Sequence, residues 1–120
     1  MLKRGEIWFA DLNPRHGTEP GKTRPVLIVQ AQALLDAEHP STYIIPLTTK
    51  LIDDAEPLRI RVPAAERLPR DSDLLIDQLR AIDNRRLVEG PLLRLPHAEM
   101  RRVTAALVEL LGGRAAPATL

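Results

Sequence analysis

Three groups of polar residues lie at the ends of predicted strands or within one, and their side chains could act on a phosphate. Arg24 ends a charged, glycine-containing loop and directly precedes the apolar run at residues 26–29. Thr48 ends a later apolar run, and Asp77 and Gln78 lie inside a third. A polar side chain beside a rigid element is well placed to meet a ligand. Arginine also offers a planar fork that binds phosphate oxygens in pairs.

Each of these positions also has a purely structural interpretation. An arginine before a proline is commonly part of a surface ion pair. Threonines after a strand commonly bond within their own turn. Asp77, inside an apolar stretch, would brace the fold through an internal polar network, which is the interpretation that its surroundings favour.

Spacing excludes several familiar sites. Gly21-Lys22-Thr23 is similar to a nucleotide-binding loop, but that loop needs four residues after its first glycine, and Gly17 leaves three. A β-favouring run follows it, not the helix that such a loop requires. The chain has no cysteine, and its three histidines are scattered, so we expect neither a metal site nor a cofactor. Arginine, threonine and carboxylate groups remain, and they suit chemistry on a phosphodiester.

Length and composition predict one small domain. The chain has 120 residues and a formal charge of +1, which gives no sign of bulk nucleic-acid binding. No apolar run reaches the length of a signal peptide or a membrane span, so we expect a cytoplasmic protein without membrane contact. We expect the domain over residues 1–113 and a flexible tail over residues 114–120.

Short strands separated by turn residues dominate the expected secondary structure. They are expected over residues 5–12, 26–29, 42–47, 57–63, 73–82 with a bend, and 92–93. Residues 26–29 are wholly apolar and predict a central strand, whereas Pro46 predicts an edge or a bulge. A helical turn is expected over residues 32–36, and a capped turn over residues 83–87. This pattern is typical of a small, closed or half-closed antiparallel barrel.

One longer helix is expected at the C-terminal end. Pro96 lies where proline is tolerated, in a first helical turn, and Gly112-Gly113 ends the helix. Between them, apolar residues at three- and four-residue spacing form one stripe: Met100, Val103, Leu107, Leu110 and Leu111.

Four ordered sequence blocks together carry a specific resemblance, which covers residues 3 to about 112. They are Lys3-Arg4-Gly5-Glu6-Ile7-Trp8 with Asp11-Leu12-Asn13-Pro14; Gly17-Thr18-Glu19 with Thr23-Arg24-Pro25-Val26-Leu27; Pro46-Leu47-Thr48; and Asp71-Ser72 with Asp77-Gln78-Leu79-Arg80-Ala81-Ile82-Asp83 and Arg86-Leu87. In these blocks the chain resembles the MazF/PemK toxins of bacterial type II toxin–antitoxin pairs.

The resemblance implies a fold and an activity. The fold is mainly β with a C-terminal helix, a small SH3-like antiparallel barrel that assembles as a homodimer. The activity is that of a metal-independent, sequence-specific endoribonuclease. It would cut single-stranded RNA to leave 2′,3′-cyclic phosphate and 5′-hydroxyl ends, and a cognate antitoxin protein would block it.

By position, the resemblance also assigns site residues. Arg24 and Thr48 match the catalytic arginine and threonine, and Glu19 and Thr18 match the RNA-contacting loop. Gln78, with Asp77 beside it, matches a position that reads RNA, and Pro20 departs from the usually polar residue of the loop. Chemically, Arg24 would anchor the phosphate and act as the acid, because arginine is too basic to serve as the base. Thr48 would donate to the transition state, and Glu19 would act as base or positioning group.

Two other functions remain open. A toxin of the same fold could bind DNA gyrase and cleave nothing, although such a protein would not need both Arg24 and Thr48. A non-catalytic barrel could instead bind nucleic acid or a peptide, since barrels of this kind recur as binding modules.

Overall fold

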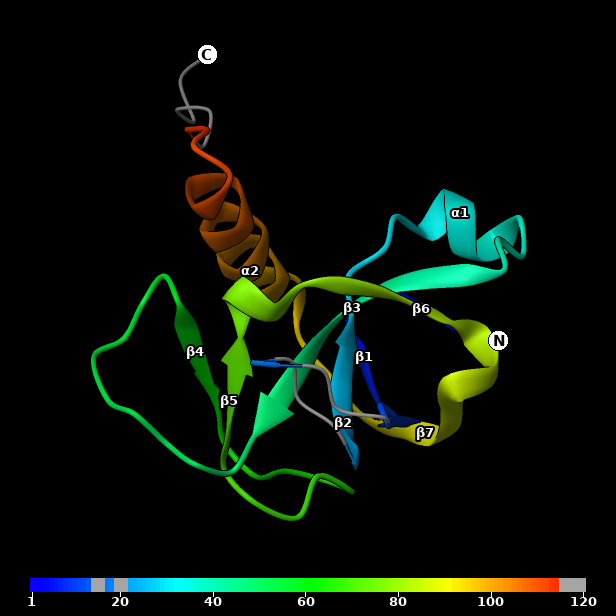
Figure 1. Cartoon of the computed structure of the whole chain (residues 1–120), viewed down its shortest axis with the longest axis horizontal. Coiled ribbons are helices and arrows are strands. Elements are labelled where there is room, and N and C mark those ends of the chain that lie inside the picture. The colour runs from blue at the N-terminus through cyan, green and yellow to red at the C-terminus, as the bar shows by residue number, and fades with distance from the viewer. Residues whose placement is uncertain (14–16, 19–21, 115–120) are drawn as a thin grey trace.

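The computed structural model describes residues 1–13, 17–18 and 22–114, and within them apolar runs become strands and the C-terminal stripe becomes a helix (Figure 1). The strands are β1 (Glu6–Asp11), β2 (Thr23–Ile28), β3 (Ser41–Thr48), β4 (Arg59–Val62), β5 (Ser72–Leu75), β6 (Arg80–Asp83) and β7 (Leu87–Arg94). The helices are α1 (Gln32–Asp36) and α2 (His97–Leu110), and single 3-10 turns occur at η1 (Ile76–Gln78) and η2 (Asn84–Arg86).

All the strands belong to one antiparallel sheet, in which β3 is central. The order is β4-β5-β3-β2-β1-β7, and β6 also pairs with β3. The first half of β3 pairs with β6, and its last two residues pair with β5. The strand predicted over residues 73–82 is therefore two strands, which η1 separates at the predicted bend.

Pro46 lies inside this central strand, so the prediction that it marks an edge strand is wrong. It pairs with Val26 of β2 and is buried. Successive residues of a strand point their backbone N–H and C=O groups toward opposite edges. The Tyr43 carbonyl accepts from the Val29 amide on the β2 side, so the nitrogen of Pro46, three residues later, points toward the other edge. There it falls between the β6 ladder, which ends at Ile44, and the β5 ladder, which begins at Leu47. The missing N–H donor therefore costs no ladder bond.

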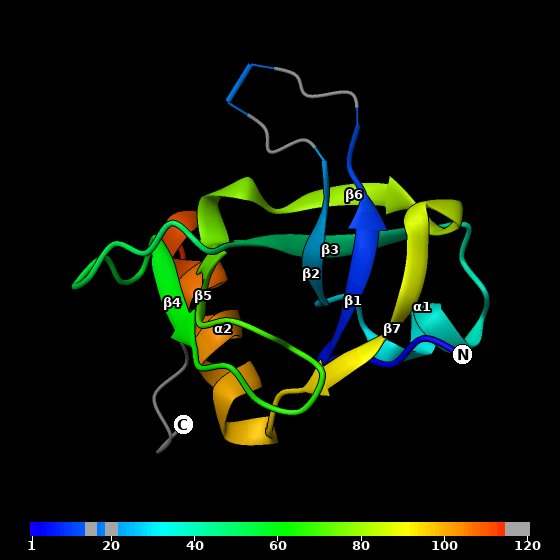
Figure 2. The same ribbon diagram turned by 90° about the horizontal axis from the view of Figure 1, so that it is seen from below.

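The sheet is curved but open, because β4 and β7 end it on opposite sides. Figure 2 shows β4 and β5 next to α2, with β7 and α1 toward the other end. The loop after β4 bridges the opening: the Arg67 amide donates to the Leu92 carbonyl at 3.0 Å, and its guanidinium bonds Glu89 at 2.7 Å. The mainly antiparallel, barrel-like fold with a C-terminal helix is thus confirmed, in its half-closed form.

Strand alternation divides the apolar residues between two clusters on opposite faces of the sheet. Leu27, Ile45 and Leu47 belong to the larger cluster, which α2 covers, whereas Val26 and Ile44 belong to the smaller one near α1. Residues 26–28 are fully buried, as expected of a central strand. Trp8 and Phe9 are split as neighbouring strand residues should be, with Phe9 against the larger cluster and Trp8 against the smaller.

The stripe of α2 is only partly buried. Met100 and Val103 are buried in the larger cluster, but Leu110 and Leu111 are 36% and 79% exposed. The last turn of the helix therefore presents apolar side chains outward. Of the predicted tail, residues 115–120 lie outside the described residues, and Arg114 is exposed.

β7 is longer than its predicted core at residues 92–93, because Gly90-Pro91 reads as a break but continues the strand. A Cβ atom on Gly90 would lie only 2.4 Å from Trp8 Cδ2 of the neighbouring strand. The glycine is thus required by the indole that lies across it. The predicted capped turn is confirmed at η2, where the Asp83 carboxylate accepts from the Arg85 amide at 2.9 Å.

Candidate active site and its groove

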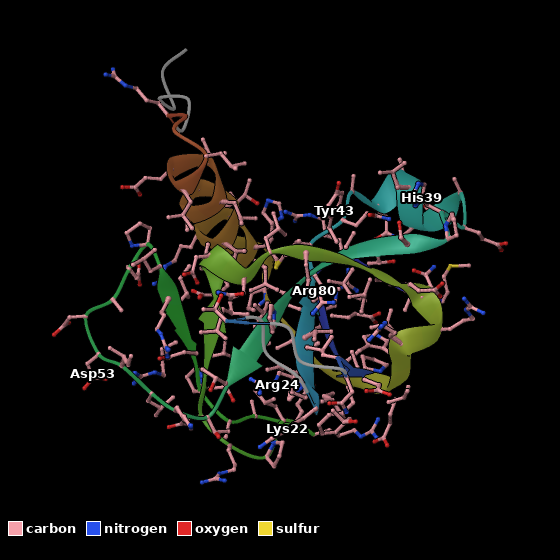
Figure 3. The ribbon with its side chains drawn as sticks, viewed as in Figure 1. Lys22, Arg24, His39, Tyr43, Asp53 and Arg80 are labelled. Atoms are coloured by element: carbon pink, nitrogen blue, oxygen red, sulfur yellow. The ribbon has the colours of Figure 1, made fainter. Side chains whose placement is uncertain are left out.

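Arg24 and Thr48 lie on neighbouring strands at the same end of the sheet. Val26 pairs with Pro46 at the end of the β2–β3 ladder, so Arg24 and Thr48 each lie two residues beyond that last pair. The Arg24 guanidinium reaches the carbonyl of Leu47, the residue before Thr48. Figure 3 shows Arg24 near Lys22, where β2 begins. The two residues that the sequence singled out separately are therefore brought together.

Local hydrogen bonds hold both side chains in place. Arg24 is half-buried, and its Nη1 donates to the Leu47 carbonyl at 3.2 Å. Thr48 Oγ1 accepts from the Lys50 amide at 3.2 Å, which is the turn bond that its structural interpretation predicts. That bond uses Thr48 Oγ1 as an acceptor, so the hydroxyl proton can still be donated to a ligand.

The same cross-strand row continues to a buried carboxylate that sequence analysis did not single out. Thr48 pairs with Asp73 of β5, which in turn pairs with Arg61 of β4. The Asp73 side chain is 1% exposed and accepts from Arg61 Nε at 2.5 Å, Arg59 Nη1 at 3.2 Å and the Ile52 amide at 2.9 Å. The alternation of Arg59 and Arg61 with apolar residues in β4 was the signal that could have indicated a carboxylate facing them.

The pKa of the Asp73 carboxyl lies below its ordinary value. Burial by itself raises the pKa of this carboxyl, but the hydrogen bonds from Arg61, the Ile52 amide and Arg59 outweigh burial and hold it below 3.8. A buried charge is tolerable only when it is paired in this way.

Thr18, Asp77 and Gln78, which the sequence assigned to substrate binding, line one groove of about 430 Å³. Arg59 lines the same groove and brings a cation to it. The interpretation of Asp77 as part of an internal polar network is wrong. It lies in η1 and is exposed, because this turn breaks the strand alternation that would have carried it inward.

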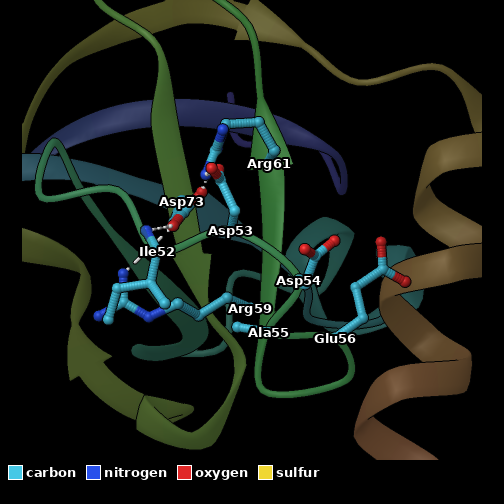
Figure 4. A pocket seen from close by; sticks show the side chains of 8 residues that line it. All are labelled: Ile52, Asp53, Asp54, Ala55, Glu56, Arg59, Arg61 and Asp73. Atoms are coloured by element: carbon cyan, nitrogen blue, oxygen red, sulfur yellow. Dashed lines mark hydrogen bonds and ion pairs between the residues drawn. The ribbon is translucent and has the colours of Figure 1, made fainter.

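A second hollow of about 530 Å³ adjoins this groove and shares Arg59 and Ile52 with it. Figure 4 shows it between the loop at residues 52–56 and the paired Arg61 and Asp73. The Arg61 guanidinium also bonds Asp53 on that loop at 2.8 Å. The loop is therefore fastened to the sheet through the Asp73 network.

A third, apolar hollow of about 330 Å³ lies between η1 and the end of α2. It is lined by Ile76, Asp77, Leu79, Leu107, Leu110 and Leu111. Asp77 thus borders both this hollow and the groove that holds Gln78. The exposed leucines of α2 lie next to the candidate substrate groove.

Two predicted positions cannot be placed, because Glu19 and Pro20 lie outside the described residues. Among the residues that are described, no cluster of three or more His, Cys, Asp or Glu side chains could hold a metal ion. No helix in the described part of the chain is long and apolar enough to cross a bilayer.

The arrangement suits stabilisation of a crowded, negatively charged phosphorus centre. A guanidinium can bind two phosphate oxygens at once, and a hydroxyl across from it can donate to a third. The groove with Thr18 and Gln78 supplies hydroxyl and amide groups, which are the groups that read the edges of unstacked bases.

Comparison with known proteins identifies the family of this chain. Residues 3–111 match the model of a family described as PemK-like, MazF-like toxin of type II toxin–antitoxin system. The Endoribonuclease MazF of Staphylococcus saprophyticus is 33% identical over 114 residues, which cover 93% of this chain and 92% of that protein.

Solved structures share the fold. MazF from Deinococcus radiodurans superposes with a TM-score of 0.76 at 23% identity, covering 92% of this chain and 96% of that one. Mycobacterium tuberculosis toxin MazF-mt6 gives 0.74 at 20% identity, with 92% and 99% covered. A MazE–MazF complex from Deinococcus radiodurans gives 0.72 at 22% identity, with 93% and 97% covered. Because the family model matches residues 3–111, nearly the whole of this chain, the chain belongs to the PemK-like, MazF-like toxin family of type II toxin–antitoxin systems.

Proposed function

We propose that this chain is a sequence-specific endoribonuclease that cuts single-stranded RNA without a metal ion. The observation that carries the proposal is that the Arg24 guanidinium reaches the end of β3, where it bonds the carbonyl of Leu47 next to Thr48. The likeness to a protein named endoribonuclease supports it. A toxin that only bound gyrase would not need this pair.

The proposed reaction is an internal transfer within the RNA strand. The 2′-oxygen attacks the adjacent phosphorus, so that a P–O2′ bond forms and the P–O5′ bond breaks. The 2′-hydroxyl proton passes to a base, for which Glu19 is the candidate. The leaving 5′-oxygen takes a proton, which Arg24 would donate. The products are a 2′,3′-cyclic phosphate and a 5′-hydroxyl.

Arg24 and Thr48 would stabilise the transition state more than the substrate. Charge on the non-bridging oxygens increases as the phosphorus becomes five-coordinate, and fixed donors bind that charge without reorganising. The bond from Arg24 to the Leu47 carbonyl fixes the guanidinium in advance. Thr18, Asp77 and Gln78 would hold the neighbouring nucleotides in their groove and set the preferred sequence.

The protein would act as a homodimer under the control of an antitoxin. The apolar hollow at Leu79, Leu107, Leu110 and Leu111 is the surface that a second copy would cover. It adjoins the substrate groove at Asp77, so a dimer would place part of its partner next to the RNA. MazF of Deinococcus radiodurans has been solved with MazE, and we propose an antitoxin partner here as well. An RNA substrate implies action in the cytoplasm.

The test is cleavage of a long, unstructured RNA by purified protein with EDTA present, followed by analysis of the fragment ends. Wild type is compared with Arg24→Ala and with the matched control Arg94→Ala, an exposed arginine of β7. We expect discrete cuts with cyclic phosphate and 5′-hydroxyl ends. Arg24→Ala should lower the rate roughly a hundred- to thousand-fold, and Arg94→Ala should leave it unchanged.

Two results would contradict the proposal. Near-normal cutting by a folded Arg24→Ala protein would remove Arg24 from the site. Absence of cuts by folded wild type across varied RNAs would favour the gyrase-binding or the non-catalytic binding alternative.

A further inference from the structure

Arg59 is the one cation among the described residues that line the groove with Thr18 and Gln78. Its side chain is 20% exposed, so it is neither sequestered in the core nor free in solvent. Nη1 donates to the Lys50 carbonyl at 2.8 Å and to Asp73 Oδ2 at 3.2 Å. Within the described residues both bonds use Nη1, which leaves the Nε and Nη2 donors for a ligand.

Asp73 determines where this guanidinium lies. Its carboxylate is buried and accepts one bond from Arg59, one from Arg61 and one from the Ile52 amide. The Ile52 bond also fixes the start of the loop that forms the other wall of the groove. A single buried group therefore positions both the cation and the loop opposite it.

Cross-strand pairing connects Asp73 and Arg59 to the candidate catalytic residues Arg24 and Thr48. Asp73 is paired with Thr48, and Arg24 bonds the carbonyl of the preceding residue, Leu47. Arg59 and Gln78 line the same groove, so an RNA base held against Gln78 would bring a phosphate of its strand within reach of Arg59. A guanidinium with two unused donors binds a phosphate more strongly than it binds a neutral base.

We propose that Arg59 binds an RNA phosphate flanking the scissile bond and that Asp73 is its positioning residue. This rests on the proposed function of the site, because it assumes that single-stranded RNA enters the groove. Arg59 is then a binding residue of the substrate path, distinct from Arg24, which acts at the reacting phosphorus.

Arg61 provides a matched control within the same network. It lies two residues further along β4 and bonds the same carboxylate by the shorter contact, 2.5 Å. It does not line the groove with Thr18 and Gln78 but faces Asp53 instead. If the network had only a structural role, Arg61→Gln would therefore weaken RNA binding at least as much as Arg59→Gln.

The experiment compares wild type, Arg59→Gln and Arg61→Gln. Binding is measured with a short fluorescein-labelled RNA that spans a mapped cut and carries a 2′-deoxyribose at the cut position, over a range of salt concentrations. We expect Arg59→Gln to weaken binding about tenfold, as for the loss of one charge-assisted hydrogen bond. It should reduce the slope of log K against log salt by about 0.7, the value for one phosphate contact on a single strand. Arg61→Gln should leave that slope unchanged.

Steady-state kinetics and Asp73→Asn separate positioning from contact. Arg59→Gln should raise KM with kcat little changed, because a flanking contact serves the ground state and the transition state alike. Asp73→Asn should raise KM in the wild-type and Arg61→Gln backgrounds but have no further effect in the Arg59→Gln background.

Equal losses of RNA affinity in Arg59→Gln and Arg61→Gln would overturn the proposal, as would an unchanged slope of log K against log salt in Arg59→Gln. So would an Asp73→Asn effect that persists without Arg59. If wild type binds RNA but cuts none, the same salt-dependent comparison is made with an unmodified single-stranded RNA, and only the nuclease proposal is contradicted. Absence of RNA binding by folded wild type would contradict both.

Discussion

Gly90→Ala should destabilise this protein by about 1–3 kcal/mol, the usual cost of forcing an extra methyl group into packed space. A Cβ on Gly90 would lie 2.4, 2.6 and 2.9 Å from three atoms of the Trp8 indole, whereas ordinary contacts begin at about 3.4 Å. These are atoms at the base of the ring, so the whole indole must move by about 1 Å. Gly90 is not among the described glycines with positive φ, so alanine meets no backbone strain there.

A loss of stability in Gly90→Ala would be opposite in sign to the usual effect of replacing an unstrained glycine by alanine. Where a glycine has no close neighbour and an ordinary φ, replacement by alanine stabilises a fold by about 0.4–1 kcal/mol through the unfolded state. Loss of stability must therefore come from the indole. Because Trp8 is the only tryptophan, its emission reports on this contact directly.

Urea unfolding, followed both by Trp8 emission and by far-ultraviolet circular dichroism, measures the effect. We expect a lower midpoint, a melting temperature lower by roughly 3–5 °C for each kcal/mol, and a shifted native emission maximum. Val88→Ala, at an exposed position of the same strand, should change the stability by less than about 0.5 kcal/mol. In a Trp8→Leu background, measured by circular dichroism, the cost of Gly90→Ala should largely vanish. An unchanged midpoint and emission spectrum in Gly90→Ala would refute the reasoning.

Three further predictions concern the site and its surroundings. Asp73→Asn should lower the free energy of unfolding by about 1–3 kcal/mol at neutral pH. Because the native pKa of Asp73 is lowered from 3.8, the stabilisation by its carboxylate is present above that pH and is lost on acidification. In urea titrations the difference in free energy of unfolding between variant and wild type should therefore be smaller at pH 3 than at pH 7, and an equal difference at both pH values would contradict this. Thr48→Val should reduce kcat about a hundredfold or more, while loss of its turn bond to the Lys50 amide should lower the stability by only about 1 kcal/mol. Thr49→Val, at the exposed neighbouring position, should leave kcat unchanged. Leu111→Asp should shift the sedimenting species from dimer toward monomer; an unaltered mass would exclude the α2 surface as the contact.

Strand positions were largely predictable because their signals are local. Residues 26–29 are apolar without interruption, so burial on both faces of the sheet could be inferred for them. β4 alternates between apolar residues and arginines, so burial on one face could be inferred for that strand. β7 was underestimated because Gly90-Pro91 is a typical break. The reason for that glycine is Trp8, more than eighty residues away in the chain, and no local pattern shows it.

The site was predictable in its members but not in its arrangement. Arg24 and Thr48 could be named from their places beside apolar runs, but their approach at one end of the sheet depends on the β2–β3 register, which propensity does not determine. Asp77 was expected inside because one strand was predicted over residues 73–82. The η1 turn breaks the alternation and leaves Asp77 exposed, whereas Asp73, in β5 before that turn, is the buried carboxylate. The stripe of α2 was correct for Met100, but Leu111 lies beyond the part of the helix that the larger cluster buries.

The pairing of the first strand with the last has a consequence for synthesis on the ribosome. β1 cannot complete its ladder until β7 has emerged, and the larger cluster also awaits Leu92, Met100 and Val103. Pairing between distant segments makes folding slow and late. A nascent chain that already carries Arg24 and Thr48 therefore lacks the completed sheet and core until β7 and α2 have been synthesised. For a proposed toxin that destroys RNA, this delay would protect the message from which it is being translated.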